Sequence, residues 1–440
     1  MKSPLHRIIF FTSLFFLGLL RLALADETLP TAIHVHSDLS SGSRSISEIA
    51  QLAKIQNVEA VIVTDIYSER IEYGLWPFRN ILKKSYEQNS LMKAGPEKYL
   101  RDIQTAAAKS GVLMIDGTAV TPFYYWTGSL WPGPLVLNNR GKDLLVLGLG
   151  TAAHYQNLPV IGNSSSRFDA YSGDQYSKPY QHFIDEARRR NGLVYWSHPY
   201  ASEHIEFNHV FLGLDVFLDT APYAEALTST FHYTGFGIYS VELAQIHNPK
   251  TDSLASPKGI WDRLLMEYCK GKRESPLWTI GEVDYTGFAD SIKNLDEILN
   301  MVIVPEKSRE AVLNSLAHGQ LYLVIPSSHD QHLRLETFRV KDSVSTKTAG
   351  LGEELSIEGT PVIQIQTRFS NNIVSQNPMQ IILIRNGEVV QHWENSVPFE
   401  LEFSDTGNTA PGKSYYRVLA YSEKQPDRLL TNPIFVQRQS

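Results

Sequence analysis

Hydrophobic and polar positions in residues 26–345 follow helical and strand periods in turn. Apolar residues recur at helical spacing within SISEIAQLAKIQ (45–56), and Ser45 and Glu48 stand at the spacing of a capping box. The next segment, VEAVIVTD (58–65), is β-branched and almost continuously apolar, which is typical of a strand covered on both faces. The pattern therefore predicts a helix over 45–56 followed by a buried strand.

The same helix–strand unit recurs three more times along the chain. Helical spacing covers residues 180–192, 261–272 and 308–319, and each run precedes an apolar strand-like segment, at 193–199, 276–284 and 320–325. A further short strand is predicted at 31–35. Helices that alternate with buried strands predict an α/β fold with a mostly parallel sheet, open or closed as a barrel.

The pattern changes after about residue 350. Alternating segments such as PVIQIQTRF and MQIILIRNGEVVQHW follow one another without helices between them. Asn386 and Gly387 between two apolar runs predict a type I′ hairpin. We therefore expect a barrel-type domain over 26–345 and a small antiparallel β-sandwich over 350–440, joined by a linker near 340–354.

The first 25 residues differ from the rest of the chain. A basic start with Lys2 and Arg7 precedes an apolar run at 8–20 and an A-x-A sequence that ends at Ala25. This arrangement predicts a secretory signal peptide over 1–25 and a periplasmic or secreted protein without stable membrane insertion after cleavage; an uncleaved anchor is the alternative. Cleavage would lower the net charge from −7 to −10, which argues against nucleic acid or an anionic membrane as partner.

Cysteine usage limits the metal chemistry that the chain can support. Cys269 is the sole cysteine, so an intrachain disulfide and a Cys₄ zinc site are excluded, and any metal must use His, Asp or Glu. Polar residues stand at the C-terminal ends of several predicted strands: His34, His36, Asp65, His198 and Asp284. Residues i and i+2 of a strand share a face, so His34 and His36 could form a metal-ligand pair; two polar residues at the start of a loop are the alternative.

Four motifs in this order resemble the PHP family, the polymerase and histidinol phosphatase domain. HVHSDLSSGS (34–43) is similar to its HxHTxxSDGS motif, VIVTDI to its TDH strand, WSHP (196–199) to its AHP motif and GEVDYT (281–286) to its GSDxH segment. Within the family, an exported branch with carbaryl-hydrolase-like proteins looks most similar. The resemblance implies a distorted (β/α)₇ barrel, up to three divalent metals at the strand C-termini, and phosphoesterase or related hydrolase activity.

Compared with the family residue by residue, the chain keeps the ligand residue at some positions and has a different residue at others. His34, His36, His198 and Asp284 match family ligand positions. The family's aspartate, histidine, bridging glutamate and final histidine are replaced by Ser41, Ile66, Ala119 and Thr286. The resemblance therefore implies a reduced site with one divalent ion, Zn²⁺, Mn²⁺ or Fe²⁺, in place of two or three.

Four further acids are candidates for supporting roles or weak ligation. Asp65 corresponds to a supporting residue of the family. Asp143 either replaces a family histidine or is a surface turn residue, and Glu242 is either a partner of a ligand histidine or a structurally paired strand acid. Glu282 precedes Asp284 by two positions and would share its face of the strand as a weak ligand.

Two functions from different classes are consistent with these residues. The first is an exported metal-dependent hydrolase of a small-molecule phosphoester, ester or carbamate, in which an ion activates a water and His198 or Asp284 takes the proton. The alternative is an inactive PHP pseudoenzyme that binds a ligand or partner. The sequence identifies no partner protein.

Overall fold

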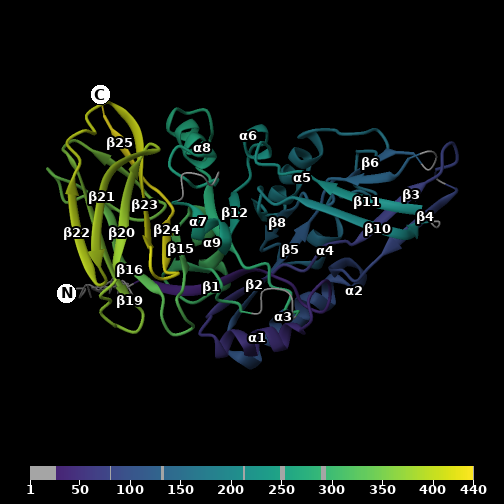
Figure 1. The fold of residues 1–440 in the computed structure, drawn as a ribbon, viewed down its shortest axis with the longest axis horizontal. Coiled ribbons are helices and arrows are strands. Elements are labelled where there is room, and N and C mark those ends of the chain that lie inside the picture. The colour runs from purple at the N-terminus through teal and green to yellow at the C-terminus, as the bar shows by residue number, and fades with distance from the viewer. Residues whose placement is uncertain are drawn as a thin grey trace, which may run out of the picture.

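The computed structural model describes residues 26–79, 81–129, 133–211, 214–247, 253–288 and 294–439. This part of the chain is a mixed α/β protein (Figure 1). The predicted signal peptide lies outside the described residues. Among the helices that the structure describes, none has the length and apolar character needed to cross a membrane.

The central sheet is built from strands of the N-terminal three quarters of the chain. Its first nine strands lie side by side in the order β13 (Trp278–Glu282), β12 (Gly235–Tyr239), β9 (Leu193–Trp196), β8 (Leu144–Leu147), β5 (Leu113–Val120), β2 (Ala60–Val63), β1 (Glu27–Val35), β14 (Leu299–Val304) and β15 (Leu321–Ile325). The pairs β1–β2, β2–β5, β9–β12 and β12–β13 are parallel, as predicted.

Strands β8, β14 and β15 depart from the predicted parallel arrangement. Strand β8 runs antiparallel to both β5 and β9, and β14 runs antiparallel to both β1 and β15. No described helix separates β5 from β8 in the chain, and an antiparallel pair needs no crossover helix. At the other edge, backbone hydrogen bonds from Val283 N to Ile33 O (2.9 Å) and from Tyr285 N to His34 O (3.0 Å) join the end of β13 to the end of β1. Because β14 and β15 extend the sheet past β1, the whole sheet is not a closed barrel, and the (β/α)₇ barrel stays a prediction.

The helices surround the central sheet. They are α1 (Ile46–Ile55), α2 (Leu91–Ala94), α3 (Pro96–Ser110), α4 (Ala152–Gln156), α5 (Lys178–Arg189), α6 (Ala226–Ser229), α7 (Ser240–Gln245), α8 (Ile260–Cys269) and α9 (Arg309–His318). The predicted capping box at the start of α1 is confirmed: Ser45 Oγ accepts from Glu48 N, and Glu48 Oε2 accepts from Ser45 N at 2.8 Å. The predicted helices near 180–192, 261–272 and 308–319 correspond to α5, α8 and α9.

The C-terminal part consists of strands. They are β16 (Leu333–Asp342), β17 (Thr348–Ala349), β18 (Glu354–Ile357), β19 (Pro361–Phe369), β20 (Pro378–Arg385), β21 (Glu388–Ser396), β22 (Phe399–Ser404), β23 (Gly412–Ser422), β24 (Arg428–Thr431) and β25 (Ile434–Arg438). The order β17-β16-β19-β22 makes one sheet, while β24-β23-β20-β21 continues the central sheet from β15. The predicted hairpin at Asn386–Gly387 is confirmed, with positive φ values of 53° and 85°.

The domain division at 345–350 stays a prediction, although β16, which precedes it, already pairs with β19. A separate lobe lies at the end of the molecule opposite to β21 and β22 (Figure 1). It contains β6 (Tyr125–Gly128), β7 (Leu135–Asn138), β10 (Glu203–Phe211) and β11 (Leu214–Thr220) in one sheet, beside a hairpin of β3 (Arg70–Gly74) and β4 (Lys83–Glu87). Tyr124, Trp126 and Leu137 belong to its own small apolar core.

Candidate metal centre

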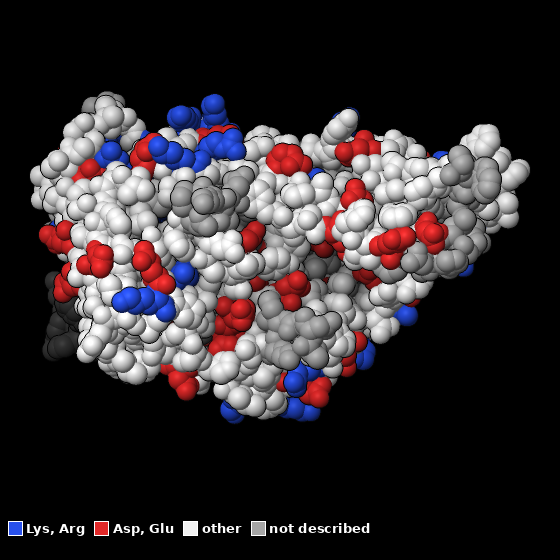
Figure 2. Space-filling model, viewed as in Figure 1, with Lys and Arg blue, Asp and Glu red and all other residues white. Residues whose placement is uncertain are grey.

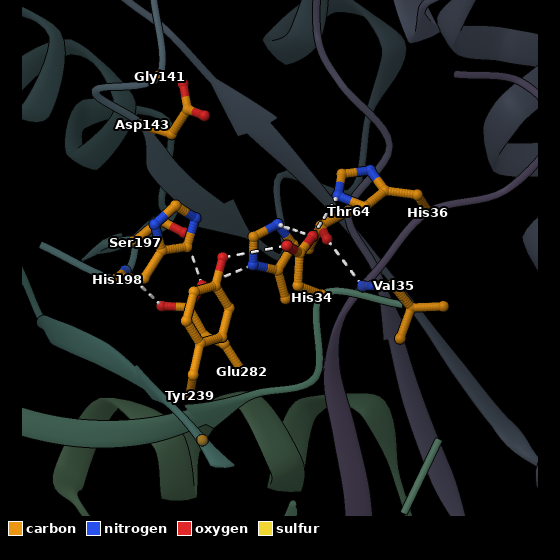
Figure 3. Close-up of polar contacts among 12 residues, drawn as sticks. His34, Val35, His36, Thr64, Gly141, Asp143, Ser197, His198, Tyr239 and Glu282 are labelled. Carbon is orange, nitrogen blue, oxygen red and sulfur yellow. Dashed lines mark hydrogen bonds and ion pairs between the residues drawn. The ribbon is translucent and has the colours of Figure 1, made fainter. Parts of the chain in front are cut away.

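Five polar side chains meet where three strands of the central sheet end. His34 and His36 lie at the end of β1, Glu282 closes β13, and His198 and Asp284 follow β9 and β13 by two residues each. We call these five residues the histidine–carboxylate cluster. Figure 3 shows the rings of His34, His36 and His198 turned toward one region. The structure therefore brings together the four ligands predicted from the sequence.

Two overlapping sets in the cluster have the spacing of metal ligands. His34, His36 and Asp284 form one set, and His34, His198 and Glu282 form the other; within each set the ligand atoms lie within 4.8 Å of one another. Asp284 Oδ1 lies 3.6 Å from His34 Nε2 and 3.5 Å from His36 Nε2. Two ligands of a tetrahedral ion with bonds of about 2.1 Å are about 3.4 Å apart, so this first set fits one divalent ion.

The backbone at three of these residues adopts a conformation that is rare for residues other than glycine. The φ angles of His34, His198 and Asp284 are 71°, 25° and 48°. The pairing of β1 with β2 shifts register between Ile33 and Val35, so His34 does not occupy a regular strand position. The expected i, i+2 strand geometry is therefore wrong as the reason why the two histidines converge. Such strain costs on the order of 1–3 kcal/mol per residue and concentrates at functional sites.

Glu282 holds the neighbouring groups in place. Its carboxylate is buried, and Oε2 lies 2.5 Å from His34 Nδ1 and accepts from Ser197 Oγ at 2.6 Å. Oε1 accepts from the backbone N–H of His198 at 2.9 Å. Both oxygens are thus engaged by the protein. A proton on His34 Nδ1 that is shared with Glu282 leaves Nε2 as the electron-pair donor on the side of Asp284, as in carboxylate–histidine–metal arrangements.

The electrostatics of the cluster favour a positive charge between its carboxylates. Burial lowers the pKa of His34, but the charge of Asp284 and the hydrogen bond and charge of Glu282 outweigh it and raise this pKa to about 9. Partial burial raises the pKa of Asp284, yet the imidazoles of His34 and His36 hold it well below its usual range. In the metal-free protein a proton on His34 therefore supplies the charge that a cation would supply.

Tyr239, the last residue of β12, is a part of the site that the sequence analysis missed. Its O–H donates to Asp284 Oδ2 at 3.0 Å, and its ring stacks on His198 with centroids 4.6 Å apart. Its position at the C-terminal end of a strand is the signal that could have identified it. His198 in turn stacks on His34 at 5.7 Å. Among the described side chains, the Nδ1 atoms of His36 and His198 are buried without a hydrogen-bond partner.

Asp65 and Asp143 lie outside both ligand sets. The buried carboxylate of Asp65 accepts from Ser37 N at 2.7 Å, Ser37 Oγ at 2.6 Å and Ser40 Oγ at 2.5 Å, so it fixes the loop that follows His36. Asp143 lies in the turn before β8, where Oδ1 accepts from Thr121 Oγ1. Figure 3 shows Asp143 apart from the three imidazoles.

Glu242 lies in helix α7 and not on a strand, so the predicted strand position is wrong. Its Oε2 accepts from the backbone N–H of Tyr239 at 3.0 Å, which caps the start of α7. Burial raises the pKa of Glu242 to about 7. The acid thus acts on the site through the backbone of Tyr239.

The positions where the resemblance expects further ligands hold side chains of a different kind. Ile66 and Ala119 are paired directly as a parallel bridge between neighbouring strands, and Tyr67 N donates to Ala119 O at 2.8 Å. Neither side chain can coordinate a cation. Thr286 accepts from Ser43 N through its backbone oxygen at 2.8 Å. Ile66 and Ala119 thus leave two of these positions without a side-chain donor atom.

A cavity of about 580 Å³ lies at the other ends of the strands. It is lined by residues at or just before the starts of β9, β12 and β13, namely Leu193, Thr234 and Trp278, and by none of the cluster residues. The Arg273 guanidinium in its wall already donates to the carbonyls of Thr230 and Leu227. This cavity is separate from the candidate metal centre.

Comparison with known proteins gives remote structural matches. No family model and no curated protein matches the sequence. A two-domain protein from Bacteroides vulgatus containing a predicted PHP-like metal-dependent phosphoesterase matches 90% of this chain and 95% of its own, at 12% identity and a TM-score of 0.37. A protein from Bifidobacterium adolescentis, named for a metal-dependent phosphoesterase, matches 60% of this chain and 92% of its own, at 13% identity and a TM-score of 0.27. At these levels of similarity, the function proposed below depends on the residues of this chain alone.

Proposed function

We propose that the chain is a PHP-type metal-dependent hydrolase with a one-ion site held by His34, His36 and Asp284, with His198 as an additional ligand. The observation that carries this proposal is the spacing of 3.5 and 3.6 Å from Asp284 Oδ1 to the two Nε2 atoms. These distances are too long for good hydrogen bonds and are close to the separation of two ligands on one ion. Two nitrogens and a carboxylate suit Zn²⁺, Mn²⁺ or Fe²⁺.

Apolar side chains at two of the four altered family positions support the one-ion site. Ile66 and Ala119 lie side by side and offer no donor atoms, so a second ion would lack a bridging carboxylate. When bound, a single ion supplies Lewis acidity toward a phosphoryl or carbonyl oxygen and lowers the pKa of a water toward about 7.

The protein's own groups have distinct tasks in the proposed reaction. Glu282 orients His34, and the Tyr239 O–H restrains Asp284. Asp284 is 39% exposed and can meet a substrate from solvent. When His198 stays off the ion, its imidazole can instead accept a proton from the attacking water. This arrangement suits hydrolysis of a phosphoester, ester or carbamate.

The location and architecture of the enzyme belong to the same proposal. Residues 1–25 would direct export to the periplasm or the exterior, where the substrate is a small molecule. The backbone hydrogen bonds between the ends of β13 and β1 support a distorted (β/α)₇ barrel with the cluster at its mouth. The C-terminal strands would form the β-sandwich.

The alternative is a pseudoenzyme that binds a ligand or partner without turnover. The pairing of Ile66 with Ala119 favours it, since the family's multi-metal chemistry is lost there. This alternative and the hydrolase differ in turnover, whether or not both bind an ion.

The test is an assay of the purified protein after reconstitution with Zn²⁺, Mn²⁺ or Fe²⁺, with aryl phosphates, aryl esters and aryl carbamates as substrates. We expect metal-dependent turnover that is abolished in His34→Ala/His36→Ala. The matched control is His204→Ala/His232→Ala, which removes two exposed histidines away from the site and should keep full activity. Metal binding without turnover on every substrate class would support the pseudoenzyme and contradict the hydrolase.

A further inference from the structure

The hairpin of β3 and β4 exposes large apolar side chains at its tip. Trp76 is 78% exposed, Phe78 57%, Ile81 79% and Leu82 51%. We call these four residues the apolar hairpin tip. They lie within one short connection, between Gly74 and Lys83. Soluble proteins rarely leave large apolar side chains grouped in this way unless the surface binds something.

The hairpin is fixed to the lobe, while the four side chains of the apolar hairpin tip stay exposed. Glu72 N donates to the Tyr124 hydroxyl at 3.3 Å, and Trp126 Nε1 donates to Glu72 O at 3.0 Å. Backbone bonds from Leu75 N to Leu82 O (2.8 Å) and from Leu82 N to Phe78 O (2.7 Å) also order the tip. The hairpin therefore presents its apolar side chains to solvent on an ordered support, at the end of the molecule farthest from β21 and β22 (Figure 1).

The charge around the tip is opposite to that of the whole chain. Residues 70–84 contain four basic residues, Arg70, Arg79, Lys83 and Lys84, and one acid, Glu72, whereas the chain has a net charge of −7. Glu72 pairs with Arg70 at 3.2 Å and with Lys83 at 2.9 Å. The Arg79 guanidinium lies 4.1 Å from the centre of the Tyr171 ring. Two of these cations are thus paired with Glu72 and one stacks on Tyr171, and the local excess of basic residues lies next to the apolar side chains.

We propose that the apolar hairpin tip inserts into the interfacial layer of a membrane that contains anionic lipid. Tryptophan favours this layer, and flanking Lys and Arg are attracted to anionic headgroups. The tip projects from the surface, which suits a bilayer better than a groove-bound peptide partner. In the space-filling view, uncharged side chains cover most of the outermost visible part of the lobe, while several acidic side chains lie on its face nearer the middle of the molecule (Figure 2). The acidic net charge of the chain argues against broad adsorption to an anionic membrane, so the proposed binding is peripheral and confined to the tip, and it weakens as salt rises.

The test is co-sedimentation of the purified chain, beginning at Asp26, with lipid vesicles. We expect binding to vesicles of phosphatidylcholine mixed with phosphatidylglycerol, and weaker binding to phosphatidylcholine alone or at high salt. Trp76→Ser/Ile81→Ser should lower the partition coefficient at least about tenfold, since both changes remove apolar surface that inserts. The fold should be unaffected because both side chains are exposed, and circular dichroism checks this.

The matched control is Ile55→Ser/Val374→Ser, which changes two similarly exposed apolar residues elsewhere and should bind vesicles like the unaltered chain. The proposal is overturned if the unaltered chain does not sediment with anionic vesicles, or if the control loses as much binding as the tip variant. It is also overturned if the tip variant changes only the oligomeric state in size-exclusion chromatography, because the tip would then contact a second copy of the chain.

Discussion

Two carboxylates of this protein, Asp262 and Asp284, lie in very different surroundings. Asp262 in α8 is 2% exposed and accepts from Tyr415 Oη at 2.7 Å, Arg417 Nε at 2.8 Å, Arg417 Nη2 at 2.7 Å and Lys258 N at 2.8 Å. Asp284 is 39% exposed, and its Oδ1 faces two imidazole nitrogens at 3.5 and 3.6 Å. The first carboxylate is saturated by protein donors, whereas the second is not.

The difference separates a structural charge from a functional one. Around Asp262, α8 is tied to β23 of the C-terminal strands by short hydrogen bonds, and the Arg417 guanidinium lies 5.0 Å from the centre of the Trp261 ring. Around Asp284, positive φ angles and unpartnered imidazole nitrogens persist. Residual strain and incomplete pairing indicate a place for something that the protein does not itself supply.

The largest expected effect is on the free energy of unfolding and concerns Asp262, the carboxylate that protein donors saturate. Arg417→Met leaves the buried Asp262 without its cation, so we expect a loss of about 3–5 kcal/mol in the free energy of unfolding, measured in urea. Metal binding per folded molecule should not change. The control Glu388→Gln breaks the exposed Lys258–Glu388 pair and should cost less than about 1 kcal/mol. Equal losses in the two variants would contradict the structural role of Asp262.

The pH dependence of the free energy of unfolding should report on the cluster around Asp284, the carboxylate that protein donors do not saturate. The pKa of His34 is raised from 6.5 to about 9, so its protonated form stabilises the metal-free fold fully below pH 6.5. This contribution, on the order of 3 kcal/mol, should be lost as pH rises through about 9. Urea unfolding of metal-free protein across this range measures it, and His34→Gln should remove the dependence. A free energy that stays constant between pH 6.5 and 9 would contradict it.

Removal of the orienting charge should weaken metal binding in the folded protein. Glu282→Gln keeps the size of the side chain but weakens its hold on His34 Nδ1, and we expect a loss of about 10–100-fold in metal affinity. Competition with a chromogenic chelator measures the affinity. Glu400→Gln, which changes an exposed acid of β22 in the C-terminal strands, is the control and should bind metal normally. Unchanged affinity in Glu282→Gln would show that Glu282 does not position His34.

The sequence predicted features that depend on neighbouring residues. The capping box of α1 and the turn at Asn386–Gly387 follow from local backbone chemistry, and both are present. The grouping of His34, His36, His198 and Asp284 was also anticipated, because all four stand at strand ends.

Features that depend on distant contacts could not be predicted in this way. The position of Tyr239 over His198 requires β12 to lie beside β9, and the roles of both oxygens of Glu282 require β13 to meet β1 and β9. The αL conformation of His34 arises where the β1–β2 register shifts, which no period in the sequence reveals. Glu242 was misplaced because an apolar strand runs directly into a short helix at residue 240.

The smallest effect is expected at Tyr239. Tyr239→Phe keeps the ring that stacks on His198 and removes one hydrogen bond to Asp284, which is worth about 1 kcal/mol. Metal affinity should fall by less than about tenfold, measured by the same chelator competition. The exposed Tyr176 gives the control Tyr176→Phe, with no change expected. A loss as large as that of Glu282→Gln would mean that Tyr239 is essential for metal binding.

The most direct measurement is the metal stoichiometry of the reconstituted protein by native mass spectrometry. The proposed one-ion site predicts one divalent ion per chain, lost in His34→Ala/His36→Ala and retained in His204→Ala/His232→Ala. Two or three ions per chain would contradict the one-ion site. No bound ion after reconstitution with Zn²⁺, Mn²⁺ or Fe²⁺ would contradict the metal centre itself.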